Sequence, residues 1–189
     1  MPQYQGVWSV QEAARLQSQQ QWVTDPYYKN TTLLLQADNA ANSAQNNTFL
    51  DSSTNAFAIT RNGNTTQGTF TPFSQTGWGN YFDGTSDYLN YGTNTNTQLG
   101  GATNFTIEAW VYPTAYNSYG PIVTNSASGT LGFGKLASGF GIRKWGTGDI
   151  VYTANTPPIG QWTHVAAVKA GNTIERLRGT TIYRCPSRP

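Results

Sequence analysis

The sequence is short of the residues that most often carry chemistry. Its 189 residues include one cysteine, Cys185, and one histidine, His164. A single cysteine excludes an intramolecular disulfide, so the fold cannot depend on one. Any Ser-His-Asp or Cys-His catalytic arrangement would have to use His164. Cys185 stands well away from it in sequence, which argues against a nucleophile there, and we expect a packing or hydrogen-bonding role for His164.

Charge is also scarce. Asp, Glu, Lys and Arg make up 11% of the residues, and the formal net charge is +2. Such a balance offers no basic stripe that would neutralise phosphates, so we expect no nucleic-acid partner. No segment approaches the ~20 apolar residues of a membrane span, and the N-terminus lacks the basic start and apolar run of a secretory signal. We therefore expect no membrane insertion, and synthesis and assembly in a cytosol.

What the chain has instead is a mixture of aromatic and uncharged polar side chains. Aromatic residues make up 13% of the sequence, while the mean hydropathy is −0.49. Such a mixture suits β-sheets with hydroxyl-rich outer faces. A chain of this length corresponds to one domain with a short appendage.

The first 30 residues differ from the rest. Ser9 and Glu12 have the spacing of a capping box, which predicts a short helix from Val10 to about Gln20. Few positions of this helix are apolar, so it needs an outside surface to be stable. Two alternatives stay open: residues 1–30 pack as a helical arm on their own domain, or they dock on a larger assembly.

From residue 31 onward the pattern changes to a period of two. Thr32–Ala37 is an apolar run of strand length. Asn62-Gly63 is a strong hairpin turn, because both residues tolerate positive φ, and predicts a strand pair. A second hairpin is predicted around Asp83-Gly84, between Asn80–Phe82 and Tyr88–Tyr91.

The clearest strand is Phe105–Tyr112, in which apolar and other residues alternate. Further short strand candidates are separated by Gly, Ser, Asn or Thr: Pro121–Thr124, Leu131–Gly134, Phe140–Arg143, Ile150–Tyr152 and Trp162–Val168. This rhythm predicts an all-β fold, an antiparallel β-sandwich.

The C-terminal segment does not fit this pattern. After a turn at Ala170–Asn172 a sandwich needs another apolar strand, yet Glu175–Gly179 is charged. We expect residues 31–174 to form the sandwich and residues 175–189 an irregular basic tail. The missing closing strand suggests a truncated or frame-altered C-terminus.

Three segments carry a resemblance to a known family: Tyr81-Phe-Asp-Gly-Thr-Ser-Asp-Tyr-Leu89, Phe105-Thr-Ile-Glu-Ala-Trp-Val-Tyr-Pro113 and Gly160-Gln-Trp-Thr-His-Val-Ala-Ala-Val168. Their order and spacing resemble the laminin-G-like jelly roll of the concanavalin A-like lectin and glucanase superfamily. The resemblance covers roughly Leu33 to Ile174 and implies a concanavalin A-like jelly-roll topology.

Four segments of the first third, Gly6–Ala13, Trp22–Tyr28, Leu33–Leu35 and Asn46–Phe57, are similar to an arrangement in tail-fibre and other virion proteins of tailed bacteriophages, especially those of cyanobacteria. This similarity implies a virion protein assembled in the host cytoplasm. Its partners would be other virion proteins, bound through residues 1–30, and a host surface glycan. We also expect a homo-oligomer.

The superfamily contains glucanases, which need two carboxyl groups about 5 to 9 Å apart. The glutamates are Glu12, Glu108 and Glu175, and no strand carries acids at i and i+2. Glu108 is the sole candidate, and we favour a structural role in which it is bonded to a Thr, Tyr or Arg neighbour. We therefore expect no catalytic residues and no enzyme activity.

Carbohydrate binding requires exposed aromatic rings that stack on sugar faces, together with polar partners. A set of residues in or beside turns meets this description: Tyr116, Asn117, Tyr119, Trp145 and Asp149. The alternative for the rings is the core of the sandwich, where most aromatic residues lie.

Asp83 and Asp87 are candidates for a metal site. Their carboxylates could contribute oxygen ligands to calcium, with Asn80, Thr85 or backbone carbonyls completing the coordination shell. The alternative is that both acids stabilise the turn through Asx hydrogen bonds. We expect no required cofactor and leave calcium open.

The sequence favours a non-catalytic virion protein for structure and host recognition, such as a tail fibre, spike or head decoration, with a carbohydrate-binding-type jelly roll. Two alternatives remain: a bacterial adhesion or carbohydrate-binding module, and a degenerate glycoside hydrolase.

Overall fold

The computed structural model describes residues 28–37, 46–73, 77–93, 99, 102–124 and 130–171, and the backbone of 173–178 and 181–185. The predicted helix from Val10 to about Gln20 lies outside these residues. Within them, one 3₁₀ turn, η1 (Tyr28–Asn30), accompanies twelve β-strands, and no helix has the length and apolarity to cross a membrane. The all-β prediction is confirmed.

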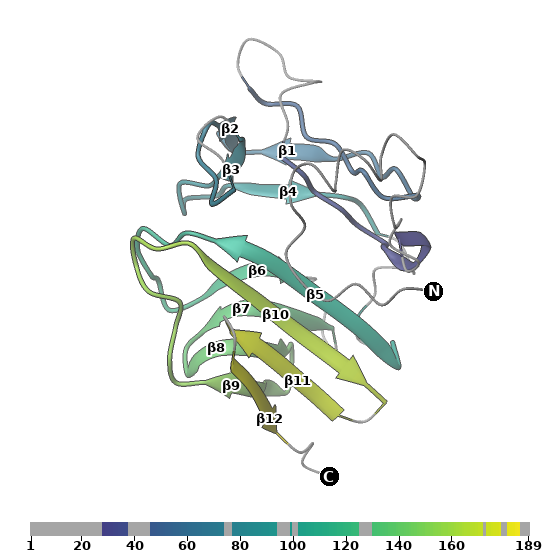
Figure 1. Ribbon diagram of the computed structural model, residues 1–189, viewed down its shortest axis with the longest axis vertical. Helices are drawn as coiled ribbons and strands as arrows, with labels where there is room; N and C mark the ends of the chain where they lie inside the picture. Colours follow the sequence, from purple (N-terminus) through teal and green to yellow (C-terminus); the bar gives the residue numbers. More distant parts are fainter. Residues whose placement is uncertain are drawn as a thin grey trace, which may run out of the picture.

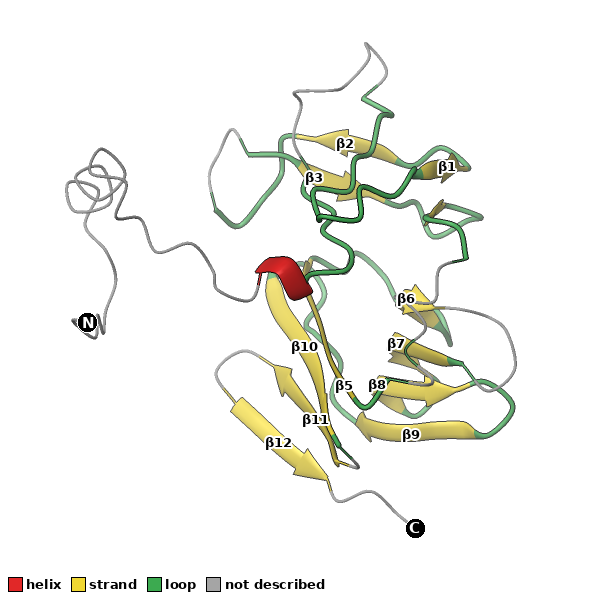
Figure 2. Cartoon of the chain, turned by 90° about the vertical axis from the view of Figure 1, so that its right-hand side faces the viewer, coloured by secondary structure: helices red, strands yellow, loops and turns green. Residues whose placement is uncertain are grey.

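Two antiparallel sheets, each of four strands, form a sandwich (Figures 1 and 2). The first sheet, in spatial order, contains β12 (Thr181–Cys185), β11 (Thr173–Arg178), β10 (Thr163–Ala170) and β5 (Asn104–Val111). The second contains β6 (Gly120–Thr124), β7 (Leu131–Leu136), β8 (Gly139–Lys144) and β9 (Gly148–Thr153). The chain passes from one layer to the other after β5 and returns after β9, so the predicted antiparallel sandwich is confirmed.

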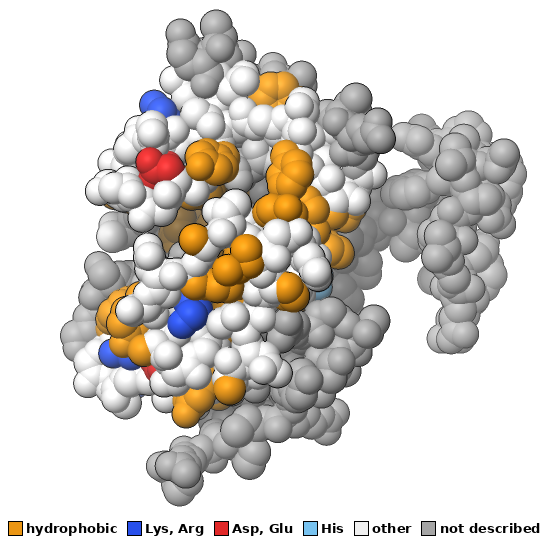
Figure 3. All heavy atoms as spheres, turned by 90° about the vertical axis from the view of Figure 1, so that its left-hand side faces the viewer, with side chains coloured by type: hydrophobic (Ala, Val, Ile, Leu, Met, Phe, Trp, Pro, Cys, Tyr) orange, Lys and Arg blue, Asp and Glu red, His pale blue; other side chains and the backbone are white. Residues whose placement is uncertain are grey.

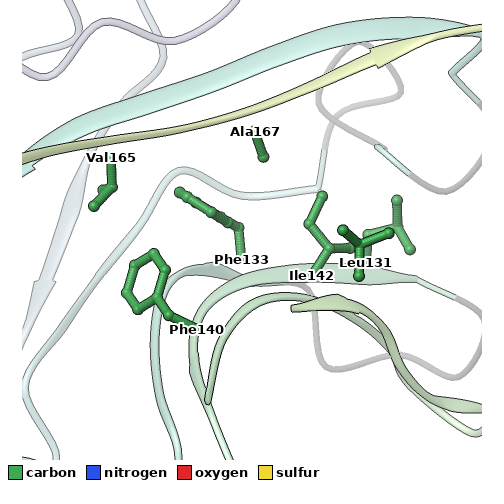
Figure 4. Packing of buried hydrophobic residues seen from close by; sticks show 7 residues of the cluster. Leu131, Phe133, Phe140, Ile142, Val165 and Ala167 are labelled. Carbon is green, nitrogen blue, oxygen red and sulfur yellow. The ribbon is translucent and has the colours of Figure 1, made fainter. Parts of the chain in front are cut away.

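The core lies between β10 and the β7–β8 hairpin (Figure 4). Phe133 and Phe140 meet edge to face, with ring centroids 5.3 Å apart, and Phe133 is 1% exposed. Val165 and Ala167 face them from β10. Burying a Phe or Val side chain stabilises the fold by about 1.5–3 kcal/mol. On β5 the odd-numbered residues face this core and the even-numbered ones are exposed, as the alternation predicts.

The C-terminal segment differs from the expected irregular tail. β11 pairs with β10, and β12 pairs with β11, so the backbone of 175–178 and 181–185 extends the first sheet. The edge of β10 away from β5 would otherwise leave unpaired N–H and C=O groups. Backbone pairing satisfies these groups whatever the side chains are, which is why the charged composition misled the prediction.

Above the sandwich in Figure 1, four short strands form two pairs: β1 (Thr60–Asn62) with β4 (Tyr88–Asn90), and β2 (Thr66–Gly68) with β3 (Gly79–Tyr81). We call this unit, residues 60–90, the nested hairpin. The two predicted local hairpins are wrong, because β1 pairs with β4 rather than with β2, and β3 pairs with β2 rather than with β4. Gly63 does adopt a positive φ of 70°, but it bends the chain between β1 and β2.

The apolar run Thr32–Ala37 is not a regular strand. Its ladder contact is a single bridge between Leu35 and Asp51. The Leu34 amide donates instead to the Asp51 carboxylate, with N and Oδ1 2.9 Å apart. A side chain thus takes the place of a neighbouring strand, and the strand prediction for this run is wrong.

Candidate functional site

The outer face of the second sheet carries one row of side chains across all four strands. The register places these residues side by side: Thr124, Gly132, Arg143 and Asp149. The adjacent row is apolar and lies in the core: Val123, Phe133, Ile142 and Val151. Because successive residues of a strand point to opposite faces, the first row points away from the core.

A β-bulge brings the two charged residues of this row together. Ile142 lies opposite Val151, but the next residue, Arg143, lies opposite Asp149, so Ile150 is the extra residue on β9. Without this shift Arg143 would face Ile150. Bulges re-aim side chains in this way, and this one places an acid beside a base.

Arg143 and Asp149 form an ion pair, with Nη1 and Oδ1 2.7 Å apart. The side chain of Asp149 is 8% exposed and that of Arg143 24%. Burial raises the pKa of Asp149, but hydrogen bonds from Ser138 and Arg143, with the positive charge of Arg143, outweigh it and lower the pKa below its ordinary value. Asp149 is therefore an anion at neutral pH.

Two aromatic rings lie against the same guanidinium. Its carbon is 5.2 Å from the ring centroid of Tyr119 and 5.3 Å from that of Trp145, within the range of cation–π attraction. Nη1 of Arg143 also lies 3.4 Å from the Tyr119 hydroxyl, and the indole N–H of Trp145 donates to Oγ1 of Thr124 at 2.9 Å. We call these five residues, Tyr119, Thr124, Arg143, Trp145 and Asp149, the Arg143 cluster.

Gly132 makes room for the indole. A Cβ at this position would lie 3.1 Å from Oγ1 of Thr124 and 3.5 Å from Nε1 of Trp145. The first distance is tighter than ordinary van der Waals contact, so a larger residue would push against the hydrogen bond that orients Trp145.

Three of the five residues predicted for a ligand site come together here: Tyr119, Trp145 and Asp149. The other two are not part of the cluster. The Tyr116 hydroxyl donates to the carbonyl of Pro157 at 2.6 Å, and Asn117 is exposed.

Arg143, around which the others gather, is not among the residues predicted for the site. A signal was present, because Arg143 and Asp149 flank a short turn rich in glycine, from Trp145 to Gly148, at which two neighbouring strands meet.

The cluster suits the apolar face of a sugar. Tyr119 is 44% exposed, and Trp145 is partly exposed. Aromatic side chains of this kind offer a flat apolar face while their polar atoms stay hydrogen-bonded. Figure 3 shows several orange hydrophobic patches on the face that it views, with white uncharged surface and a few blue and red charged groups among them. Exposed apolar groups are therefore not confined to the Arg143 cluster, and what distinguishes it is one guanidinium, held by an ion pair, that lies against two rings.

Asp83 and Asp87 stabilise the loop of the nested hairpin. The Thr85 amide donates to Asp83 at 2.6 Å, and the Asp83 and Asn64 amides donate to Asp87 at 2.9 and 2.7 Å. Burial opposes ionisation of Asp87, but these hydrogen bonds and the charge of Arg61 lower its pKa. The contact between Asp83 and Thr85 is a predicted Asx bond, whereas Asp87 joins the two ends of the loop and the distant Asn64. Calcium binding here stays a prediction.

Glu108 and His164 meet on the outer face of the first sheet. Their Oε2 and Nε2 atoms are 3.3 Å apart, so the expected Thr, Tyr or Arg partner of Glu108 is wrong. The His164 ring also lies 5.3 Å from that of Trp110. Within the described ranges, no three His, Cys, Asp or Glu side chains gather as metal ligands do.

Comparison with known proteins identifies the fold family. A family model described as the concanavalin A-like lectin/glucanases superfamily matches residues 83–183, which is more than half of the chain. No curated protein and no solved structure matches the sequence. The matched span runs from before β4 into β12 and so includes strands of both sheets of the sandwich and the whole Arg143 cluster. The chain belongs to the concanavalin A-like lectin/glucanases superfamily, whose lectin-type fold it adopts.

Proposed function

We propose that this protein is a non-catalytic glycan-binding protein and that the Arg143 cluster is its binding surface. The observation that carries the proposal is the pair of partly exposed rings, Tyr119 and Trp145, both of which lie against one guanidinium. The cluster lies on the outer face of a lectin-type sheet. Rings, hydroxyl groups and a guanidinium are the groups that carbohydrate sites use.

The contacts within the cluster preorganise it. The ion pair holds Arg143, the guanidinium holds both rings, and Thr124 fixes the rotation of the indole. Side chains that are already ordered lose little conformational entropy when a ligand binds. A sugar ring would therefore meet a surface that needs little rearrangement.

The absence of catalysis is part of the proposal, and it is supported by how the carboxylates are used. Hydrolysis of a glycoside needs two carboxyl groups about 5 to 9 Å apart. Asp149 is engaged by Arg143, and Glu108 by His164. A degenerate hydrolase is the competing function. It predicts polysaccharide turnover that Glu108→Gln abolishes, and an inactive wild-type protein would dismiss it.

The binding proposal is tested with the purified full chain on a printed array of microbial and animal glycans. Replacing Trp145 with alanine removes a stacking surface, so we expect affinity for the bound glycan to fall about tenfold, equivalent to about 1.4 kcal/mol. Trp145→Phe retains a ring and should lose less. Tyr88→Ala is the matched control, because Tyr88 is 53% exposed but lies on β4, outside the cluster.

Two results would contradict the proposal. One is a folded wild-type protein that binds no glycan on the array. The other is binding that Tyr88→Ala weakens as much as Trp145→Ala does, since the surface would then lie elsewhere.

We further propose that this binding serves host recognition by a virion, as part of a tail fibre, spike or head decoration. The support is the similarity of four N-terminal segments to phage virion proteins: Gly6–Ala13, Trp22–Tyr28, Leu33–Leu35 and Asn46–Phe57. Residues 1–30 would dock to other virion proteins during assembly in the host cytoplasm, and a homo-oligomer would present several copies and raise avidity.

Deletion of residues 1–30 tests the virion role, with incorporation into particles as the measurement. We expect the deletion to prevent incorporation while glycan binding by the isolated protein persists. Undiminished incorporation would reject the docking proposal. A protein that binds glycans but enters no particle would instead support a bacterial adhesion or carbohydrate-binding module.

A further inference from the structure

The outer face of the second sheet carries one positive and one negative charge. Of the charged residues on its four strands, Lys135 and Lys144 lie in register with Phe140 and Leu131, which face the core. These lysines therefore belong to the opposite face from Arg143, whose register neighbours are Gly132 and Asp149. Among the described residues of these strands, Arg143 and Asp149 are the charged pair of the outer face.

This pair is internally balanced. Nη1 and Oδ1 are 2.7 Å apart, and the Asp149 side chain is almost buried. The lowered pKa of Asp149 means that the carboxylate keeps its charge at neutral pH. The guanidinium is also shared by the two rings beside it. A ligand that approaches the rings thus meets no net charge.

An acidic sugar would fit this surface poorly. A carboxylate, sulfate or phosphate group that bound Arg143 would lie close to Asp149, which is already paired with the same guanidinium. Like charges at such short range repel. The new anion would also lose water without gaining an unpaired cation. An uncharged sugar needs only the ring faces and hydrogen-bond partners.

We infer that the Arg143 cluster takes uncharged glycans and rejects their carboxylated, sulfated and phosphorylated forms, with Asp149 as the residue that determines this specificity. The inference rests on the proposed function of the same surface. Asp149 acts in two ways: it holds Arg143 in place beside the rings, and it repels an anionic ligand. Specificity commonly needs such a repulsive element besides the attractive ones.

The test uses an array on which each acidic glycan is printed beside its neutral parent: sulfated beside unsulfated galactan, a uronate polymer beside its reduced hexose form, and sialylated beside desialylated oligosaccharide. Wild-type protein should bind neutral members and bind their acidic partners more weakly. Asp149→Asn removes the negative charge, so we expect the ratio of acidic to neutral binding to rise about fivefold, the scale of a partly exposed ion pair. The gain should fade at high salt.

Two further variants separate charge from loss of structure. Asp149→Glu retains the carboxylate and should retain the neutral preference. The double variant Arg143→Gln with Asp149→Asn has no charge at the cluster, so acidic binding should return to the wild-type ratio even if affinity falls. The thermal unfolding midpoint of each variant shows that it is folded before its binding is compared.

The outcomes are distinct. Wild-type preference for acidic members would overturn the inference and leave the proposed glycan-binding function standing. A folded Asp149→Asn protein with an unchanged ratio would overturn the role of Asp149. Absence of binding to every glycan would overturn the proposed function and this inference together.

Discussion

Asp51 is 8% exposed, and its carboxylate accepts hydrogen bonds from the amides of Leu34, Ser53 and Phe57 at 2.9, 2.9 and 3.0 Å. The Ser53 hydroxyl donates to it as well, at 2.8 Å. One side chain thereby joins two segments, residues 31–37 and 49–57, that form no regular sheet with each other. Sequence periodicity gives no sign of this, because the partner of each amide is a carboxylate rather than a strand.

The first prediction concerns this carboxylate. In Asp51→Asn the side chain has one acceptor oxygen and one NH₂ donor, so it cannot accept from all the backbone amides that the carboxylate binds. We expect the unpaired amides to lower the free energy of unfolding by about 1–3 kcal/mol. Urea denaturation at pH 7 measures the change. Ser53→Ala removes one of the four hydrogen bonds to Asp51, together with the longer contacts of the Ser53 hydroxyl to Thr32 and Asn55. Because the three amide donors to the carboxylate remain, it should have a smaller effect. If Asp51→Asn were as stable as the wild-type protein, the stabilising role of the Asp51 carboxylate would be contradicted.

The pH dependence of stability follows from the same contacts. Burial raises the pKa of Asp51, but the hydrogen bonds from Leu34, Phe57 and Ser53 outweigh it and lower the pKa below the ordinary 3.8. A lowered pKa in the folded protein means that stability is full above the unfolded-state pKa and is lost as the pH falls through the folded-state pKa. We expect unfolding free energy to decline below 3.8, and to decline less steeply in Asp51→Asn. Equal slopes for the two proteins would reject this linkage.

At the scale of the element, strands were predicted best where one face is buried. β5 to β10 lie at the positions that alternation and turn residues indicated, with ends shifted by one to a few residues. The buried face fixes the register of such a strand, because a slip of one residue would expose its apolar side chains. The strands of the nested hairpin have three residues each, too few for alternation to choose their partners.

Gly141 on β8 illustrates a constraint that sequence patterns do not reveal. A Cβ there would lie 2.0 Å from the backbone carbonyl oxygen of Val151 on β9. No side-chain rotation relieves a clash with backbone, so the hairpin would have to shift.

We therefore predict that Gly141→Ala lowers the free energy of unfolding by about 1–3 kcal/mol, the usual cost of overpacking. Gly68→Ala on β2 is the matched control, because no atom lies within 4 Å of its added Cβ, and it should be neutral or slightly stabilising. Urea denaturation of both variants provides the comparison. Equal stability of the two variants would show that β8 and β9 separate easily.

At the scale of the whole molecule, aromatic rings join the nested hairpin to the sandwich. Phe70, in the segment between β2 and β3, meets Tyr112 and Trp162 with ring centroids 4.8 and 5.3 Å apart. Phe73 meets Trp110 at 5.4 Å. Tyr112 and Trp162 border β5 and β10, so these contacts run from one unit to the other.

Removing these ring contacts should lower the local stability of the nested hairpin while the sandwich remains folded. For Phe70→Ala we expect the amides of β2 and β3 to exchange with deuterium about tenfold faster, since losing a partly buried aromatic contact costs about 1.4 kcal/mol of local stability. Exchange in β7 and β8 should not change. Phe82→Ala is the control, because Phe82 is 45% exposed and Phe70 53%. Uniform acceleration across all four strands would instead indicate one cooperative unit.

The candidate site shows the same division between what patterns predict and what they do not. Tyr119, Trp145 and Asp149 were foreseeable because aromatic and polar residues beside turns stay near the surface. Arg143 was not, because its neighbours depend on a bulge at Ile150 that shifts β9 by one residue. The predicted fold survives such local shifts, whereas the composition of a site does not.

The sequence by itself determined the all-β class and the positions of the long strands, because both depend on local alternation and turn chemistry repeated along the chain. It also determined the lectin-type family, through the resemblance of three motifs to that family. Only the tertiary structure decided which strands pair in the nested hairpin, that residues 175–178 and 181–185 extend a sheet, and that Arg143 meets both Asp149 and two aromatic rings. These outcomes depend on backbone groups finding partners across distant segments, and many pairings of that kind are compatible with one pattern of side chains.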